Sequence, residues 1–558
     1  MCGIFGGTLI SSDIASKAIN LIHRGDDGIT VEKLDENIFF AARRHLVKKS
    51  GKNESDKLTS DQPYKSEDNR ISLIFNGEFY NFKNIKDQLI EKKVLFKTEG
   101  DTEVFLKLYE SEGVNFLNNR LIDSMFSIAI FDKKREKILI ARDWPGRIPL
   151  YYYHKDDCFI FSSELKGFKA ISNLSLKEPV ELEPGHYVEF CLKSNTIEKK
   201  KFFSPKNNLI KKDNTILKIG EKFNELLDES SKNRTMGDVP ICTMLSGGID
   251  SYLTTYYVFK NLKKINPNFE PVSYVYGVKG KSIVDVEKAR LASEGFSEIG
   301  HRLVEVIGEP EDLVNDVPGI AYSFEMRKLK ALSFYPLPIY WYLAPRMKKD
   351  GFKVTIGGHG VDELLGAYDS WKELDKPHEV QIRSASRMFF INGIYNNMLK
   401  RASIIFMNRG PIEARFPFLQ PNVCEYLLSI DSKWLKLTKH NAEILLDLIE
   451  KSDSKEKLQQ LYDSLTLYLN NENDYYKNTP NEIKKDIEKI FWKFPLLVSS
   501  FYESKKSFLK FHLAFRPKLR GQHGAGITSL ESDIINKYAK YGNSDKEIFL
   551  NLSNELFK

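Results

Sequence analysis

Short runs of apolar or alternating residues between turn-forming residues dominate the first 200 residues, a pattern that is typical of strands. Helical periodicity is present there but rarer. The pattern predicts strands over 71–75, 126–131 and 137–141 and helices over 13–23 and 102–112. A polar stretch rich in lysine and asparagine, residues 193–214, is the best candidate for a linker.

Beyond this stretch the pattern changes to an alternation of strands and helices. It predicts strands over 241–245, 271–278 and 353–356 and a helix over 252–262. Such alternation favours an α/β fold with a parallel, doubly wound sheet. We therefore expect two domains, residues 1–200 and 201–558, the second with a charged, mostly helical insertion at about 433–494.

Composition narrows the class of protein. The 558 residues are 42% hydrophobic, enough for substantial cores, and their net charge of +7 comes largely from lysine runs that are typical of solvated loops. The five cysteines are odd in number and widely spaced, which argues against a disulfide framework or a zinc site. No apolar run approaches the length of a membrane span. We expect a soluble, cytoplasmic protein with neither a nucleic-acid nor a membrane partner.

Candidate chemistry begins at residue 2, because the chain starts Met1-Cys2-Gly3. An initiator methionine is usually removed before a residue as small as cysteine. Cys2 would then bear a thiol and a free α-amine, whose ordinary pKa near ~8 suits a base close to neutral pH. Nucleophile and base would be joined in one residue. The alternative is an ordinary apolar N-terminus with a chance cysteine.

A second motif, Leu-Ser-Gly-Gly-Ile-Asp-Ser at 245–251, lies between a predicted strand and a predicted helix. Its two glycines let the backbone approach a ligand, and the helix presents free N–H groups and a positive dipole end to an anion. The motif SGGxDS is not the GxxxxGK[ST] loop, so γ-phosphoryl transfer is disfavoured. A grip on pyrophosphate indicates adenylation of a substrate. The alternative is a tight strand–helix turn.

Cys2 together with SGGxDS resembles the glutamine-hydrolysing asparagine synthetase family, and the resemblance covers most of the chain. It implies an N-terminal class II glutamine amidotransferase domain, an αββα sandwich of the N-terminal-nucleophile hydrolase type. It also implies a C-terminal ATP-pyrophosphatase domain with a doubly wound parallel sheet. Glutamine, ATP and a carboxylate acceptor are the expected substrates and Mg²⁺ the expected cofactor, and a homodimer would be in keeping with the family.

The glutamine-binding landmarks of the family follow one another in the first domain. Residues 23–28 resemble HRGPDG, with Asp26 in place of proline. By the resemblance, Arg44 binds the α-carboxylate of glutamine, since a guanidinium can pair with both oxygens. Asp101, in the segment Gly-Asp-Thr-Glu, would hold the α-ammonium group.

Residues 76–81, Asn-Gly-Glu-Phe-Tyr-Asn, resemble the family motif NGEIYN. The resemblance implies that the Asn76 side chain and the Gly77 N–H form an oxyanion hole. Such donors stabilise the charge that develops in a tetrahedral intermediate. Glu78 would help to bind glutamine.

In the second domain the resemblance assigns residues to ATP and Mg²⁺. The implied ATP-binding residues are Leu245, Ser246, Gly247, Gly248, Asp250, Ser251, Tyr276, Gly357 and Gly358, of which Leu245 and Tyr276 would line the adenine pocket. Asp250 and Asp362 are the implied metal ligands, because Mg²⁺ prefers hard oxygen ligands. Asp285 matches an acidic residue of the same region. Lys518, in Arg-Pro-Lys at 516–518, matches the late R-x-K of the family and would face the acyl-adenylate.

Three departures from the family concern the acceptor. His359 stands where asparagine synthetases carry glutamate, and it could act as a base or reshape the pocket. The segment that begins at Glu325 lacks the TTIR core of the family and carries Lys328 in place of an aspartate, and Gln420 replaces another aspartate. The acceptor is then either aspartate or a specialised carboxylate, such as a sugar acid or a natural-product intermediate. Arg327 and Lys328 would suit an acidic substrate, or form an exposed ion pair.

The implied reaction joins the two domains. Cys2 attacks the glutamine side-chain amide, releasing ammonia and leaving a thioester that water hydrolyses. Mg-ATP converts a carboxylate into an acyl-adenylate, and ammonia displaces AMP after crossing an internal passage that excludes solvent. His359 and Lys518 join Cys2, Asn76 and Gly77 as candidate catalytic residues. The rivals are an ATP-dependent lactam or peptide cyclase and a non-catalytic nucleotide-binding relative.

Overall fold

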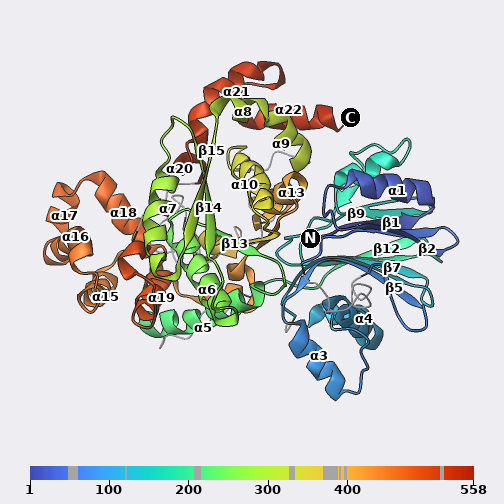
Figure 1. Ribbon diagram of the computed structural model, residues 1–558, viewed down its shortest axis with the longest axis horizontal. Coiled ribbons are helices and arrows are strands. Elements are labelled where there is room, and N and C mark those ends of the chain that lie inside the picture. The colour runs from blue at the N-terminus through green and yellow to red at the C-terminus, as the bar shows by residue number, and fades with distance from the viewer. Residues whose placement is uncertain are drawn as a thin grey trace.

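The computed structural model describes residues 1–47, 61–119, 122–206, 215–325, 334–367, 387–388, 391, 393–394, 399–515 and 521–557. The chain forms two parts that lie side by side, with the N-terminus between them (Figure 1). The first part contains two antiparallel sheets and the second a parallel sheet.

The first part is a sandwich of two six-stranded sheets. One sheet has the order β10-β8-β9-β1-β3-β2, and the other has the order β12-β11-β7-β6-β5-β4. The strands are β1 (Gly3–Thr8), β2 (Ile29–Asp35), β3 (Ile38–Arg43), β4 (Tyr64–Lys65), β5 (Ile71–Phe79), β6 (Ser124–Asp132), β7 (Lys137–Arg142), β8 (Tyr151–Lys155), β9 (Cys158–Ser162), β10 (Val180–Glu181), β11 (His186–Cys191) and β12 (Thr196–Lys201).

Helices cover both outer faces of the sandwich. α1 (Ser12–Leu21) packs on the sheet of β1 and β3, and α4 (Asp101–Glu112), with α3 (Phe82–Glu91) beside it, packs on the sheet of β5. The two sheets enclose a core of alternate side chains from both, including Phe40, Ile74 and Ile140. The four layers are those of the expected αββα sandwich.

The polar stretch that the sequence suggested as a linker begins inside this sandwich. β12 pairs with β11 along its whole length and forms the exposed edge of its sheet. Its Lys-rich sequence suits that place, since charged side chains protect an edge strand from pairing with other chains. The linker prediction was therefore wrong for Thr196–Lys201; residues 207–214 lie outside the described residues.

The second part is built on a five-stranded parallel sheet in the order β15-β14-β13-β16-β17. The strands are β13 (Ile241–Met244), β14 (Val272–Val278), β15 (Arg302–Gly308), β16 (Val354–Ile356) and β17 (Glu413–Arg415). The strand order reverses between β13 and β16. In such sheets a ligand binds at the carboxyl ends of the strands beside the reversal, so the loops after β13 and β16 border the expected site.

Helices lie on both faces of this sheet, with α6 and α7 on one side and α10 and α13 on the other (Figure 1). Among the described residues, the helices from α5 to α14 are α5 (Ile216–Arg234), α6 (Ile249–Ile265), α7 (Val284–Glu294), α8 (Pro310–Asn315), α9 (Val317–Phe324), α10 (Leu337–Lys349), α11 (Val361–Leu365), α13 (Lys400–Arg409) and α14 (Pro421–Ser429). The doubly wound architecture expected from the alternating pattern is present.

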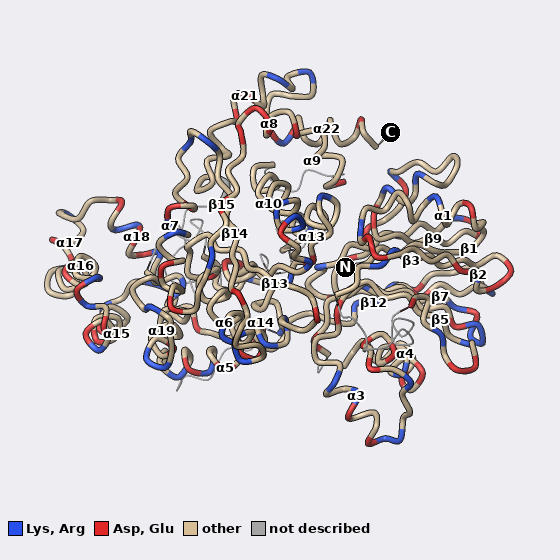
Figure 2. The backbone as a smooth tube through the Cα atoms, viewed as in Figure 1, with Lys and Arg blue, Asp and Glu red and all other residues tan. Residues whose placement is uncertain are grey.

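The charged segment near the C-terminus is helical, as its pattern predicted. α15 (Lys439–Glu450), α16 (Gln459–Asn470), α17 (Glu472–Asn478) and α18 (Asn481–Phe491) form a lobe far from the first part (Figure 1). The chain ends with α19 (Phe494–Ser504), α20 (Gly521–Gly524), α21 (Glu531–Lys537) and α22 (Asp545–Leu556). Acidic and basic residues are interspersed over both parts (Figure 2). Among the described helices none is long and apolar enough to cross a membrane.

Candidate active site

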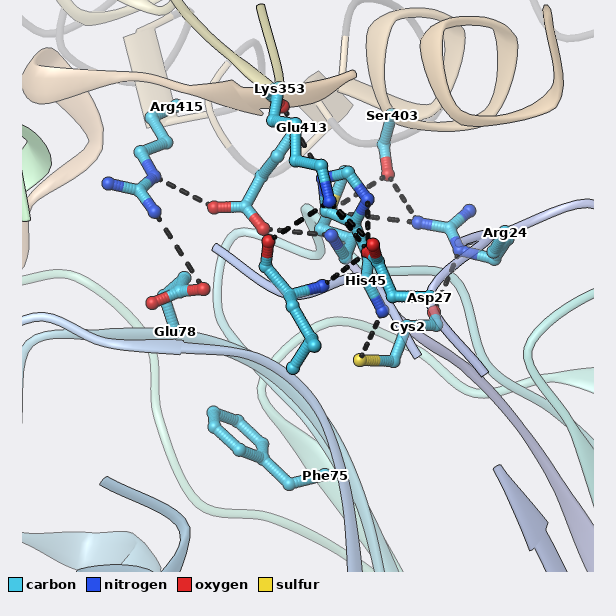
Figure 3. Close-up of polar contacts among 12 residues, drawn as sticks. Cys2, Arg24, Asp27, His45, Phe75, Glu78, Lys353, Ser403, Glu413 and Arg415 are labelled. Carbon is cyan, nitrogen blue, oxygen red and sulfur yellow. Dashed lines mark hydrogen bonds and ion pairs between the residues drawn. The ribbon is translucent and has the colours of Figure 1, made fainter. Parts of the chain in front are cut away.

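Cys2 lies immediately before β1, at the boundary between the two parts (Figure 3). Its Sγ accepts a hydrogen bond from the His45 N–H at 3.4 Å, and its carbonyl oxygen accepts one from Arg24 Nε at 3.2 Å. Burial raises the pKa of the Cys2 thiol, while the nearby N-terminal ammonium group and the His45 N–H act in the opposite direction. The thiol therefore depends on neighbouring donors to reach its nucleophilic thiolate form.

The predicted oxyanion residues lie near Cys2, at the end of β5. Asn76 is fully buried, and its Nδ2 donates to Ser163 Oγ at 3.3 Å. The same hydroxyl oxygen accepts a hydrogen bond from the Ile4 N–H at 2.9 Å. Ser163 thus ties Asn76 to the strand that follows Cys2.

Gly77 has a backbone conformation that only glycine adopts easily. Its φ is +150°, and a Cβ built there would lie 1.9 Å from the carbonyl oxygen of Met125 on β6. Since real Cβ atoms never approach a carbonyl oxygen so closely, glycine is required for β5 to pair with β6 here.

The predicted glutamine-binding residues come from three elements. Asp101 is the first residue of α4, and its Oδ2 accepts a hydrogen bond from the Phe79 N–H at the end of β5, at 3.1 Å. Arg44 follows β3 and forms an ion pair with Asp61.

Glu78 is joined to the second part by Arg415 of β17. Arg415 Nη2 lies 3.7 Å from Glu78, and its Nε donates to Glu413 at 2.7 Å. Glu413, in turn, accepts from the α-ammonium group of Met1 at 2.8 Å (Figure 3). Burial, and then the charge of Glu413, raise the pKa of Glu78 well above its ordinary value.

The SGGxDS loop connects β13 to α6, as predicted. Ser251 Oγ accepts from the Ser246 N–H at 3.2 Å and donates to the Gly248 carbonyl at 3.0 Å, and Gly248 precedes the first residue of α6. The loop thus holds the N-terminus of a seventeen-residue helix at the reversal of strand order. This is a favourable position for a phosphate group.

The loop after β16 packs directly on the SGGxDS loop. A Cβ on Gly358 would lie 2.6 Å from the carbonyl oxygen of Asp250, so the close approach needs glycine. One ammonium group bridges the carboxylates of the two motifs. Lys493 Nζ lies 2.5 Å from Asp250 and 2.6 Å from Asp362. The two predicted metal ligands therefore converge on a common point, which a cation occupies.

The side chain of His359 contacts residues of the second part. Its Nε2 forms a hydrogen bond with Tyr340 Oη at 2.8 Å, and its ring packs edge-on against Phe416 with centroids 4.8 Å apart.

Tyr276, a predicted adenine-pocket residue, is buried and stacks on Tyr342. Leu245 is fully buried, and its N–H donates to the Tyr274 carbonyl.

Several predicted residues cannot be compared with the structure. Lys518, Arg327 and Lys328 lie outside the described residues. Glu325 is described, and its carboxylate accepts hydrogen bonds from the Leu165 and Lys166 N–H groups of the first part. Asp285, in the first turn of α7, packs against α20, which follows the Lys518 segment.

Sequence reasoning missed roles for Lys493, Glu413, Arg415 and Ser163. Glu413 and Arg415 lie in Glu-Ala-Arg at 413–415 and Ser163 in Ser-Glu-Leu-Lys at 163–166, and neither segment indicates by itself a contact with residues beside Cys2. Lys493 follows the helical lobe and has no motif of its own. Only the fold reveals that it meets Asp250 and Asp362.

Comparison with known proteins places these sites in a family. A glutamine amidotransferase domain model matches residues 1–204, and an asparagine synthase model matches residues 222–390. A probable glutamine-hydrolysing asparagine synthetase of Dictyostelium discoideum is 27% identical over an alignment of 450 residues, and the match covers 77% of this chain and 76% of that protein. One of Schizosaccharomyces pombe is 28% identical over 458 residues, with the same coverage.

Among solved structures, an allosteric regulatory enzyme of purine biosynthesis is similar at 16% identity and a TM-score of 0.32, over 55% of this chain and 80% of that one. The two family matches occur in the order and at the places where the sandwich and the parallel sheet were found. The chain belongs to the glutamine-hydrolysing asparagine synthetase family of ligases.

Proposed function

We propose that this protein transfers the amide nitrogen of glutamine to a carboxylic acid, which it first activates as an acyl-adenylate with ATP. The observation that carries this proposal is the position of β17 between the two candidate sites. At one end Glu413 contacts the α-ammonium group of Met1, the residue before Cys2. At the other end the Arg415 carbonyl accepts from the Gly357 N–H, and Phe416 contacts His359.

In the first step, Cys2 attacks the side-chain amide of glutamine once Met1 has been removed. The α-amine then carried by Cys2 takes the thiol proton, directly or through a water molecule. Asn76 Nδ2 and the Gly77 N–H stabilise the oxyanion of the tetrahedral intermediate. Arg44 and Asp101 bind the α-carboxylate and α-ammonium groups of glutamine. Ammonia leaves, and water hydrolyses the remaining thioester to glutamate.

In the second step, the SGGxDS loop and the N-terminus of α6 hold the pyrophosphate portion of ATP. The acceptor carboxylate attacks the α-phosphorus, and pyrophosphate leaves. Lys493 lies where it can pair with the phosphates, since its ammonium group is 2.5 Å from Asp250 at the start of α6. Ammonia then attacks the acyl carbon and displaces AMP. Lys518 is proposed to stabilise the charge that develops there.

The residues present fit Mg²⁺. Asp250 and Asp362 supply hard carboxylate oxygens, and both reach the single point at which the Lys493 ammonium group lies. When bound, Mg²⁺ would neutralise phosphate charge and orient the leaving pyrophosphate. We propose that Asp250 and Asp362 hold the metal ion and that Lys493 then turns toward the phosphates.

The acceptor is proposed to lie beside His359, which Tyr340 and Phe416 hold in place. Its chemistry is that of a carboxylic acid, and L-aspartate is the first candidate because the relatives are asparagine synthetases by name. Residues 1–200 are proposed as the glutaminase domain, and residues 201–558 as the synthetase domain.

A pair of cysteine variants tests the first half of this proposal. Cys2→Ala is expected to abolish the release of glutamate from glutamine and to leave Mg-ATP binding unchanged. Cys158→Ala, a half-buried cysteine at the start of β9, should leave both unchanged. Mass spectrometry of the purified protein should show a chain that begins at Cys2. Glutamine hydrolysis by Cys2→Ala at the wild-type rate would overturn the assignment.

A further inference from the structure

The loop that carries Asp27 is held by a lysine of the second part. Lys353 Nζ donates to both carboxylate oxygens of Asp27, at 2.6 and 2.8 Å. The same carboxylate accepts from the Leu46 N–H at 2.8 Å, and the Asp27 N–H donates to the Arg44 carbonyl at 3.1 Å. Asp27 therefore fixes the main chain of residues 44–46 to Lys353.

His45 lies in the middle of that fixed segment, and its two ends face different partners. The main-chain N–H donates to Cys2 Sγ, whereas the ring Nε2 lies 3.4 Å from the Lys353 carbonyl oxygen (Figure 3). Burial holds the pKa of the His45 imidazole well below its ordinary value, so the ring is neutral and Nε2 carries the hydrogen that this carbonyl accepts. Lys353 thus contacts the 44–46 segment through its side chain, whose Nζ donates to the Leu46 carbonyl at 3.4 Å, and through its main chain.

Lys353 immediately precedes β16, which leads to the synthetase site. β16 pairs with β13, the strand before the SGGxDS loop, and with β17. Its last residue, Ile356, is followed by Gly357, Gly358 and His359. A strand of only three residues therefore separates the contact with the glutaminase segment from the loop beside the proposed ATP and acceptor sites.

We propose that Lys353 is a positioning residue for the Cys2 thiol. Through Asp27 and the 44–46 main chain, it holds the His45 N–H at the distance from which that group stabilises the thiolate. The inference rests on the proposed role of Cys2 as the glutaminase nucleophile. It adds that Lys353, a residue of the synthetase domain immediately before β16, sets the geometry of the nucleophile.

The test compares Lys353→Met with Lys348→Met. Lys348 forms an equivalent ion pair with Asp26 across the same boundary at 2.9 Å, but its side chain is 53% exposed and its partner does not bind the 44–46 segment. Lys353→Met is expected to weaken one hydrogen bond to the thiolate. It should therefore slow alkylation of Cys2 by iodoacetamide about threefold to tenfold. We expect kcat for glutamine hydrolysis to fall by a similar factor.

The KM for glutamine is expected to stay within about twofold of wild type in Lys353→Met, because Lys353 touches none of the proposed glutamine-binding residues. Lys353→Arg should restore most of the alkylation rate, and Lys348→Met should match wild type. Asp27→Asn keeps an oxygen for the Leu46 N–H but loses the charge, and it should reproduce part of the defect if Lys353→Met folds poorly.

Two results would overturn the proposal. One is an alkylation rate in Lys353→Met that equals that of Lys348→Met. The other is an equal loss of alkylation, glutamine hydrolysis and Mg-ATP binding with a lowered thermal midpoint, which would indicate a merely structural role. Failure of the proposed function itself is distinguishable, since wild-type protein would then hydrolyse no glutamine although Cys2 could still be alkylated.

Discussion

At the scale of the residue, Gly77 shows how strongly the sheet constrains the glutaminase site. Gly77→Ala is expected to lower the kcat of glutamine hydrolysis by about 100-fold or more, because the displaced main chain removes an oxyanion donor. The control is Gly300→Ala, since Gly300 also has a positive φ, +73°, but no atom within 4 Å of its Cβ position, and it lies in the second part. A Gly77→Ala protein as active as Gly300→Ala would contradict the role given to this N–H.

The position of Lys493 between two carboxylates leads to a prediction about the metal site. Lys493→Met leaves two carboxylates facing each other without their common cation, and removal of a buried ion-pair partner costs about 3–5 kcal/mol. Its thermal midpoint should fall below that of Lys489→Met, a lysine of α18 for which the structure shows no ion pair. Added Mg²⁺ should recover part of the loss. A midpoint that Mg²⁺ does not raise would count against a metal site at Asp250 and Asp362.

Local motifs in the sequence indicated some of these residues as candidates. Asn76, Gly77 and the SGGxDS loop each lie in a short segment whose residue types indicate a chemistry without knowledge of the fold. Lys493 acts instead through residues that lie far from it in the sequence, and only the packing of α19 against α5 and α6 brings it to Asp250. A lysine in a Lys-rich chain gives no sign of such a contact beforehand.

At the scale of the element, β17 links the two sites. The pKa of its Glu413 leads to a prediction about how the stability of the fold depends on pH. Burial would raise the pKa of Glu413, but the N-terminal ammonium group and Arg415 outweigh it and hold the pKa at about 2. Because this value lies below the ordinary 4.5, the carboxylate stabilises the fold above pH 4.5, and that contribution is lost as the pH falls toward 2.

Glu413→Gln should therefore show a shallower fall of the thermal midpoint than wild type between about pH 4.5 and pH 3. The measurement is a series of thermal melts on both proteins, and Arg415 pairs with Glu413 whether or not Met1 is present. Glu309→Gln, whose partner Lys279 is exposed, should behave like wild type. Parallel curves for Glu413→Gln and wild type would contradict the ion pair.

Helices and strands with a clear hydrophobic period were predictable from the sequence. A strand whose conformation depends on pairing with a neighbouring strand was not. The predicted strands over 71–75, 126–131 and 137–141 correspond to the cores of β5, β6 and β7, whose apolar side chains face the core between the sheets or the α3–α4 layer. β12 has no apolar signal because every residue is exposed, and its strand conformation follows from pairing with β11. Hydrophobic pattern cannot reveal a strand of that kind.

At the scale of the whole molecule, a buried ionic cluster joins the two parts. Lys166 Nζ lies 3.1 Å from Glu164 and 3.8 Å from Glu325 of the second part, and all three side chains are fully buried. Lys166→Met should lower the thermal midpoint and separate the melting of the two domains, because it leaves two carboxylates without their shared cation. Lys169→Met, three residues away, is the matched control, because the exposed Lys169 also contacts the second part, at the Leu556 carbonyl. Equal melting curves for the two variants would show that the cluster does not hold the parts together.

The measurement that tests the central claim most directly is the nucleotide product formed with glutamine, Mg-ATP and a carboxylic acid, beginning with L-aspartate. The account predicts AMP and pyrophosphate, with one glutamate released for each AMP. In Cys2→Ala, glutamine should no longer support AMP formation, whereas added ammonia should. Formation of ADP and phosphate, or equal AMP formation from glutamine by wild type and Cys2→Ala, would contradict it.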